Sequence, residues 1–333
     1  MANILMLYHF SPPTTANYLA RAFKAEGHDV RTAGTMASLQ GFREPYRLWG
    51  PHTYPLGESE MLEAYDWRHG WTAKKRLGDW MPDLMLWVES GNGYASAMMG
   101  EWSEGIPSAA YFIDSHNPQK LEWHKRMAGA FHYRFCAMRP WCDELGAHWL
   151  PLACDPEIHT PRAYSEEYDL AWVGGPWGAS PLYRKRFETM ERLQQRYRCN
   201  FKSGVYFEDM ADVYGSAKIG WHMSVTGGDL DMRVFEVMCS GRPLVTDSET
   251  DGDLNRLFSC DGLDAYDIGV GDAPCAVPCW SYDNDDEMWD ELEYLLTAGP
   301  ELRAAIGADA RAAVLAHHTY RHRVREILRE CGL

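Results

Sequence analysis

The sequence lacks the features that mark several common protein classes. Its nine cysteines include no Cys-x-x-Cys pair, and Cys239 lies in an apolar helix-like stretch. We therefore expect reduced thiols rather than disulfides or a structural zinc. The apolar run at the N-terminus is broken by His9 and Pro12 and has no basic segment before it, so we expect no signal peptide, no membrane span and a cytoplasmic location. No Gly-x-Ser-x-Gly elbow and no His-Glu-x-x-His motif occurs, which argues against hydrolases.

Basic side chains are also scarce. The 333 residues contain 32 Lys and Arg against 48 Asp and Glu, a formal net charge of −16. This balance argues against a general nucleic-acid binder, because attraction to phosphate needs clustered positive charge. The excess of acid is uneven: residues 1–150 carry 14 basic and 16 acidic side chains, and residues 151–333 carry 18 and 32. The nearly neutral first half keeps a nucleic-acid partner open.

The length and the apolar pattern predict two α/β lobes. A chain of 333 residues exceeds the usual size of one domain. The first lobe begins with the strand, helix and strand that are typical of a parallel α/β sheet: a strand at residues 3–8, a helix at 16–26 ended by Gly27, and a strand at 29–32. Three prolines between residues 151 and 161 mark a crossing, after which the pattern restarts. The other predicted segments are strands at 82–89, 109–114, 168–173, 218–222 and 243–247, and helices at 181–195, 232–240 and 300–328.

Three titratable residues follow predicted strands of the first lobe. His9, Glu89 and Asp114 stand at strand ends, where ligands bind in open parallel sheets. Each is a candidate for a general base, and the sequence does not choose among them. A structural role for His9 is an equal alternative.

The strongest local signal covers residues 227–246. Two glycines precede a predicted helix that begins near Asp231, so backbone N–H groups and the positive helix end could bind an anion such as a diphosphate. Arg233 is its natural charged partner. Glu236, one turn further on, could accept hydrogen bonds from ribose hydroxyls.

The same stretch has simpler interpretations. A Gly-Gly-Asp sequence before a helix is more often a loop and a cap than a ligand site. Asp229-Leu230-Asp231 also fits the Asp-x-Asp motif of metal-dependent transferases that have a single Rossmann-like core. The tandem lobes argue against that alternative, so we predict that Asp231 caps the helix and that the site holds no metal.

Two nearby segments of this stretch carry a family resemblance: Met232-Arg233-Val234-Phe235-Glu236 and Gly241-Arg242-Pro243-Leu244-Val245-Thr246-Asp247. Together they resemble the donor-site helix of GT-B glycosyltransferases. Within them it is most similar to the group that contains the spore maturation protein CgeB. The other segments that agree with this group are residues 150–156, 173–175, 206–210 and 318–323. The resemblance covers most of residues 80–330.

This resemblance implies a donor site for a nucleotide-sugar in the second lobe and an acceptor site in the first. It assigns the donor ribose to Glu236, with Arg233 on the same helix. It assigns the diphosphate loop to Gly174 and Gly175, and the nucleobase to the segment that begins with Tyr206. Arginines, lysines and helix ends would neutralise the leaving diphosphate without a metal.

Three further residues complete the predicted donor site. They are His222 at a strand end, Asp229 beside the glycines, and Arg184, which could stabilise the leaving diphosphate. Two more basic residues follow Arg184 on its helix, and we expect two of the three to be solvated. Many retaining members of the family carry a second glutamate where this chain has Gly228, so retention versus inversion stays open.

Residues 42–80 combine eight aromatic side chains with six basic ones and contain few strand signals. We interpret this stretch as an insertion on the first lobe. Its rings could stack on sugars or bases. Packing within a loop-rich subdomain explains the aromatic content equally well.

Together these features predict an α/β protein of GT-B fold, with two Rossmann-like lobes and a cleft between them. The acceptor lobe would be residues 1–150 and the donor lobe residues 151–316, with a last helix at 317–333 packed back toward the first lobe. We expect transfer of a sugar from a nucleotide-sugar, a UDP-sugar being favoured and no cofactor needed, to a hydroxyl. The acceptor could be a hydroxymethylated pyrimidine in DNA, a protein or glycan, or a small metabolite. The alternatives are a nucleotide-sugar epimerase of the same fold and a non-catalytic two-lobe sugar-binding protein.

Overall fold

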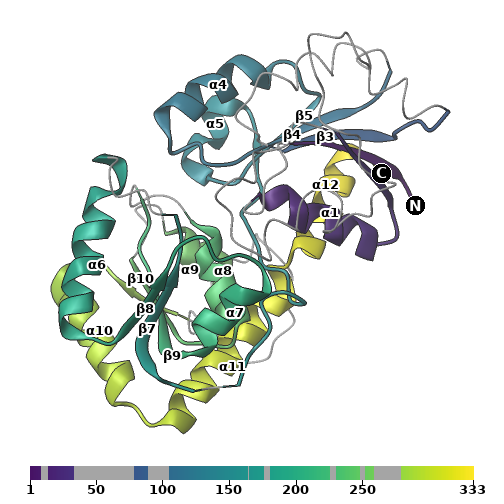
Figure 1. The fold of residues 1–333 in the computed structure, drawn as a ribbon. Coiled ribbons are helices and arrows are strands. Elements are labelled where there is room, and N and C mark those ends of the chain that lie inside the picture. The colour runs from purple at the N-terminus through teal and green to yellow at the C-terminus, as the bar shows by residue number, and fades with distance from the viewer. Residues whose placement is uncertain are drawn as a thin grey trace. The chain divides into compact units, whose positions relative to one another are not determined.

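The computed structural model describes residues 1–8, 14–33, 79–88, 105–163, 165–175, 181–225, 230–247, 252–258 and 279–333. The chain divides into two compact units (Figure 1). The first is formed by Met1–Pro151 together with Tyr320–Leu333, and the second by Leu152–Thr319. Among the described helices, none is long and apolar enough to cross a membrane.

The first unit is built on a six-stranded sheet of order β2-β1-β3-β4-β5-β6, in which every neighbouring pair is parallel. The residues of β3 and β4 are all buried, as expected for parallel strands that are covered on both faces. The strands are β1 (Asn3–Leu7), β2 (Asp29–Ala33), β3 (Leu84–Val88), β4 (Ser108–Phe112), β5 (Tyr133–Cys136) and β6 (His148–Trp149). The helices are α1 (Thr15–Ala25), α4 (Pro118–Ala128), α5 (Cys142–Leu145), α12 (Tyr320–Cys331) and the 3₁₀ helix η4 (Arg139–Trp141).

The last helix, α12, belongs to the first unit. It packs on α1, where the rings of Tyr18 and Tyr320 are stacked with their centroids 5.2 Å apart. It also contacts the edge strand β6, because Nε2 of His148 lies 2.7 Å from Oε1 of Glu326. That hydrogen bond raises the pKa of His148. The C-terminal segment is thus held to the first unit by both stacking and charge.

The second unit is built on a five-stranded sheet of order β11-β10-β9-β7-β8, again with parallel neighbours. Its strands are β7 (Tyr168–Val173), β8 (Cys199–Lys202), β9 (Ala217–His222), β10 (Leu244–Asp247) and β11 (Trp280–Tyr282). Its helices are η5 (Pro181–Tyr183), α6 (Arg184–Arg196), α7 (Glu208–Gly215), α8 (Met232–Cys239), α9 (Asp253–Phe258), α10 (Asp285–Thr297) and α11 (Pro300–His317). The predicted α/β class with two parallel sheets is confirmed.

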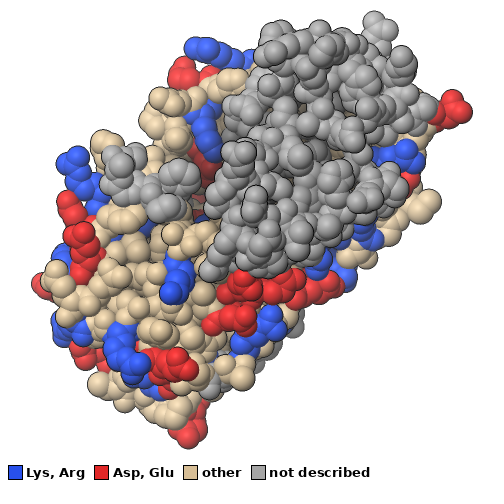
Figure 2. Space-filling model, in the orientation of Figure 1, with Lys and Arg blue, Asp and Glu red and all other residues tan. Residues whose placement is uncertain are grey.

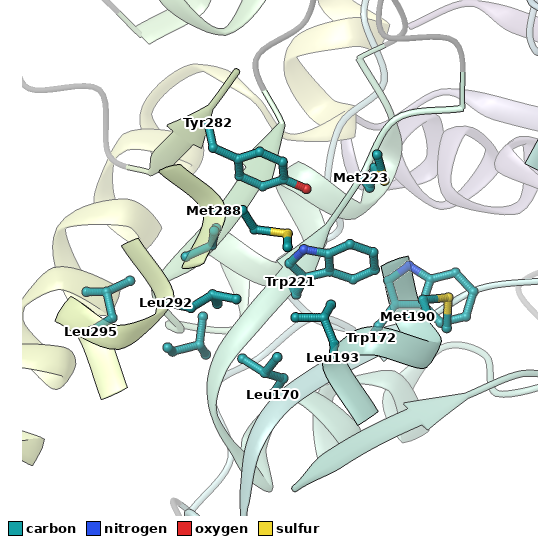
Figure 3. Close-up of a cluster of buried hydrophobic side chains, with 12 residues drawn as sticks. Leu170, Trp172, Met190, Leu193, Trp221, Met223, Tyr282, Met288, Leu292 and Leu295 are labelled. Carbon is teal, nitrogen blue, oxygen red and sulfur yellow. The ribbon is translucent and has the colours of Figure 1, made fainter. Parts of the chain in front are cut away.

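A buried apolar cluster joins this sheet to α6 and α10 (Figure 3). Trp172 and Trp221 of the sheet lie among Leu193 of α6 and Leu292 of α10. The opposite face is covered by α7 and α8, and α11 packs on α8. Gly307 lets α11 pass close to the end of α8, because a Cβ there would lie 2.1 Å from the carbonyl oxygen of Gly241. The sheet therefore sits between two helical layers.

The helical region predicted over residues 300–328 consists of two helices, α11 and α12, which are separated at residues 318–319. His318 leaves the helical conformation, with φ −124° and ψ 41°. Its carbonyl oxygen accepts a hydrogen bond from the backbone N–H of Cys154 at 3.1 Å, and Thr319 forms a parallel bridge with the same residue. The His318 ring packs against Phe258, with centroids 4.7 Å apart. Contacts with distant residues thus end a helix that the local composition would continue.

Candidate functional site

The candidate site lies at the carboxyl ends of β7 and β9. These two strands are neighbours, and after β7 the chain places β8 on one side and β9 on the other. Ligands of open parallel sheets bind at this kind of switch point. β7 ends at Val173 and β9 at His222. Nε of Arg233, from the first turn of α8, donates to the carbonyl oxygen of Val173 at 3.1 Å, so the start of α8 lies at the end of β7.

The sequence explains where α8 begins and ends. Asp231 has an extended backbone (φ −84°, ψ 155°), and its side chain accepts a hydrogen bond from the backbone N–H of Arg233. This confirms that Asp231 caps the helix. Gly241 ends it with a φ of +72°, a conformation that glycine adopts without strain. The positive end of α8 is therefore fixed at the switch point.

Asp231 also holds two guanidinium groups in place. Nη1 of Arg233 lies 3.2 Å from its Oδ1, and Nη2 of Arg186 lies 3.8 Å from its Oδ2. Burial alone would raise the pKa of Asp231, but Arg233, His222 and Arg186 hold it well below its usual range. The carboxylate is thus ionised, and two arginines surround this one aspartate at the start of α8.

Arg186 is the buried member of the basic run that opens α6. Only 7% of its surface is exposed, and its Nε and Nη2 atoms have no hydrogen-bond partner among the described residues. Arg184 and Lys185 are exposed, so the structure places Arg186, not Arg184, beside Asp231. The sequence contained a signal for this, because Arg186 precedes the buried Met190 by one helical turn and shares its face of α6.

His222 contributes a neutral imidazole. It is 1% exposed, and burial, with the added repulsion of Arg186 and Arg233, lowers its pKa to about 3 although Asp231 opposes the shift. Neither ring nitrogen has a hydrogen-bond partner within the described part of the chain. A neutral imidazole can donate one hydrogen bond and accept another. His222 can therefore contact a ligand at the end of β9 without adding charge.

Glu236 is the most unusual group at the site. Its side chain is fully buried, and neither carboxylate oxygen has a hydrogen-bond partner among the described residues. The nearest positive group is Arg233, whose Nε lies 3.9 Å from Oε2, and Nε2 of His159 lies 3.6 Å from Oε1. Burial raises the pKa of Glu236 to about 7 despite Arg233. A carboxylate in this state requires hydrogen-bond donors from elsewhere.

The other predicted donor residues that the structure describes lie around the end of β7. Gly174 is required by packing, because a Cβ there would lie 2.2 Å from Cζ2 of Trp172. Gly175 follows it and is half-buried. Tyr206 precedes α7 and is half-buried; burial raises its pKa, and the Arg233 guanidinium partly offsets that rise. Gly174 thus has a structural role that sequence reasoning did not find.

The remaining predicted residues lie either in the first unit or outside the described residues. Asp114 follows β4 in the first unit, where it has a φ of +58° and pairs with Nζ of Lys120 at 2.7 Å. His9, Glu89 and Asp229 lie outside the described residues. The same holds for the predicted insertion at 42–80, except for its last two residues. Two residues of the site, Arg186 and His159, were not predicted. Within the described ranges, no group of three or more His, Cys, Asp or Glu side chains could hold a metal ion.

The surface of the described residues carries both signs of charge. In the view of Figure 2, Lys and Arg side chains alternate with Asp and Glu over the described part of the face. This distribution forms no continuous basic track on that part of the surface, which a nucleic-acid backbone would need.

Comparison with known proteins identifies the relatives of the chain. A family model described as glycosyl transferase-like matches residues 159–329, about half of the chain. No curated protein matches it. Among solved structures, it is similar to sucrose-phosphate synthase from Thermosynechococcus elongatus, with 11% identity, a TM-score of 0.62 and coverage of 99% of this chain and 98% of that one.

Two more solved structures cover the chain from end to end or nearly so. The Anabaena protein HepE, in complex with UDP and glucose, is 11% identical with a TM-score of 0.62, and the match covers 100% of both chains. A UDP-N-acetylglucosamine 2-epimerase is 11% identical with a TM-score of 0.54, covering 99% of this chain and 97% of that one. These likenesses show the fold: two parallel-sheet domains that match GT-B structures.

Proposed function

Because the chain belongs to the glycosyl transferase-like family, we propose that it transfers a sugar from a nucleoside diphosphate sugar to an acceptor hydroxyl, and that the nucleotide binds at the ends of β7 and β9. UDP is the favoured nucleotide. HepE was solved with UDP and glucose, and the epimerase takes its name from a UDP-sugar.

The buried carboxylate of Glu236 is the observation that carries this proposal. It lies at the switch point, and neither of its oxygens makes a hydrogen bond to the described residues. The two hydroxyls of a ribose supply the two donors that its oxygens need. Burying such a group without a partner costs stability, so the position is suited to a ligand rather than to the fold.

The diphosphate would bind at the start of α8. Arg233 and Arg186 supply positive charge there, and the helix end adds a partial charge of the same sign. As the bond to the sugar breaks, negative charge grows on the leaving diphosphate, and groups fixed before the reaction stabilise it best. Asp231 supplies this fixation, since it contacts both arginines. The proposal assigns this role to Arg186 in place of Arg184, and it needs no metal.

The acceptor side of the proposal rests on the first unit. Asp114, His9 and Glu89 are the candidate general bases that deprotonate the attacking hydroxyl. The acceptor is a hydroxymethylated pyrimidine in DNA, a protein or glycan, or a small metabolite. Membership of the CgeB-like group and a cytoplasmic location belong to the same proposal.

A thermal-shift screen tests the donor assignment. Wild-type protein is heated with UDP, ADP, GDP or CDP, because a ligand of the folded state stabilises it by about 2.7 kcal/mol at a concentration of 100 Kd. We expect UDP to give the largest shift. Arg233→Ala should lose the shift, whereas Glu191→Gln, an exposed position on α6, should keep it. No shift with any nucleotide, or an unchanged shift in Arg233→Ala, would sink the assignment.

A nucleotide-sugar epimerase is the second candidate, because the 2-epimerase shares the fold. The two activities separate when the protein is incubated with UDP-sugars and no acceptor. An epimerase converts the sugar, which proton NMR detects, whereas a transferase leaves it intact apart from slow hydrolysis. Binding without turnover toward any acceptor would instead indicate a non-catalytic sugar-binding protein.

A further inference from the structure

The turn formed by residues 155–159 fixes one buried histidine beside the candidate site. The backbone N–H of Asp155 donates to Nδ1 of His159 at 3.2 Å, and the backbone N–H of His159 donates to the carbonyl oxygen of Asp155 at 2.8 Å. Because Nδ1 accepts a hydrogen bond, the ring proton of the neutral imidazole is on Nε2. The two hydrogen bonds of the turn therefore determine both the position and the tautomer of this ring.

A second contact ties the turn to α8. Nη1 of Arg311, on α11, donates to the carbonyl oxygen of His159 at 3.2 Å and also to the carbonyl oxygen of Cys239, the last residue of α8. His159 is fully buried. Its Nε2 lies 3.6 Å from Oε1 of Glu236, just beyond hydrogen-bond distance. A small movement of the carboxylate would bring these two atoms within hydrogen-bond distance.

We infer that His159 is a positioning residue: its Nε2–H orients the carboxylate of Glu236 and leaves the other oxygen lone pairs free for the ribose hydroxyls of the donor nucleotide. This inference rests on the proposed function. His159 acts through Glu236 and needs no contact with the nucleotide. Without it, Arg233 would be the nearest positive or donor group to the Glu236 carboxylate among the described residues.

If His159 orients Glu236, nucleotide affinity should depend on pH in a way that can be measured. Only the ionised carboxylate accepts a hydrogen bond from each hydroxyl of the ribose. The groups that face Glu236 are Arg233 and Asp231 at the start of α8, Tyr214 of α7 and His159. Burial raises the pKa of Glu236 to about 7 in the ligand-free protein, so nucleotide affinity should rise as the pH passes through neutrality. Removing the His159 donor should raise this pKa further.

Isothermal titration calorimetry with UDP between pH 6 and pH 9 tests the inference. We expect His159→Phe to move the rise in affinity upward by about one pH unit, a loss of about tenfold at pH 6.5 that largely disappears at pH 9. His159→Gln, which retains an N–H group, should restore the wild-type profile. A uniform loss at every pH, or an unshifted profile in His159→Phe, would overturn the inference.

A second measurement needs no nucleotide. The carboxyl carbon of Glu236 is followed by ¹³C NMR during a pH titration of glutamate-labelled protein, and its signal is assigned by its loss in Glu236→Gln. Its midpoint should rise in His159→Phe and return in His159→Gln; an unchanged midpoint would contradict the inference. If wild-type protein binds no nucleoside diphosphate, the proposed function fails while the NMR result still decides whether His159 controls Glu236.

Discussion

Glu236→Gln should make the ligand-free protein more stable and, at the same time, unable to bind its nucleotide. The folded chain raises the pKa of Glu236 from 4.5 to about 7 because the carboxylate is buried. The folded state therefore binds this proton more tightly than the unfolded chain. Binding of a proton to Glu236 stabilises the folded state in full below pH 4.5, and this stabilisation is lost as the pH rises through 7. Above neutrality the free energy of unfolding of the wild type is therefore lower by about 3 kcal/mol. Glutamine is neutral at every pH and escapes this loss.

Thermal unfolding at two pH values measures the effect. For a unit of the size of Leu152–Thr319, 3 kcal/mol corresponds to about 6–12 °C in melting temperature, so Glu236→Gln should melt higher than wild type by up to that amount at pH 8.5. By pH 5 the difference should shrink below about 1 kcal/mol. Saturating UDP should raise the melting temperature of the wild type but not of the variant.

Two outcomes would refute this reasoning. A variant that is less stable than wild type at pH 8.5 would show that the carboxylate supports the fold, as a hydrogen-bonded glutamate does. An equal UDP shift in both proteins would show that Glu236 does not bind the ribose. Glu191→Gln, at an exposed position, is the control and should change neither the melting temperature nor the UDP shift.

Three further predictions concern neighbouring features. Arg186→Ala should weaken UDP binding at least about tenfold in calorimetry, because it removes a buried cation, whereas the exposed Arg184→Ala should stay within about twofold. Gly174→Ala should lower the melting temperature, because its Cβ would displace the buried Trp172 ring at a cost of about 1–3 kcal/mol. His148→Ala should destabilise the first unit at pH 5.5 more than at pH 8.5. The carboxylate beside His148 raises its pKa, so that contribution is present below pH 6.5 and lost as the pH rises through the raised value.

Each of these predictions can fail. Equal UDP affinity in Arg186→Ala and Arg184→Ala would show that Arg186 does not contribute to UDP binding. Gly129→Ala serves as the control for Gly174→Ala, because a Cβ at residue 129 meets nothing within 4 Å. An equal loss in both glycine variants would show that the Trp172 contact is unimportant. A pH-independent effect of His148→Ala would mean that packing, not charge, holds β6 to α12.

The strands at the centre of both sheets could be predicted from sequence for a physical reason. Parallel strands buried on both faces are short apolar runs, and β3 and β7 stand out as such between turn residues. β8 could not be found in this way, because this edge strand has the sequence Cys-Asn-Phe-Lys and is only partly buried. Its place in the sheet is set by pairing with β7.

The candidate site was predictable where its residues share one helix. Arg233 and Glu236 lie one turn apart on α8, and local signals, the Asp231 cap and Gly241, define that helix. His159 could not be predicted, because residues 155–159 have the composition of a crossing loop. Only the fold brings that turn to α8.

A crystal structure of the protein with UDP bound tests the donor site most directly. We expect ribose hydroxyls within hydrogen-bond distance of both Glu236 oxygens, and a diphosphate at the start of α8 in contact with Arg233 and Arg186. UDP bound elsewhere in the chain, or bound with its ribose away from Glu236, would contradict it.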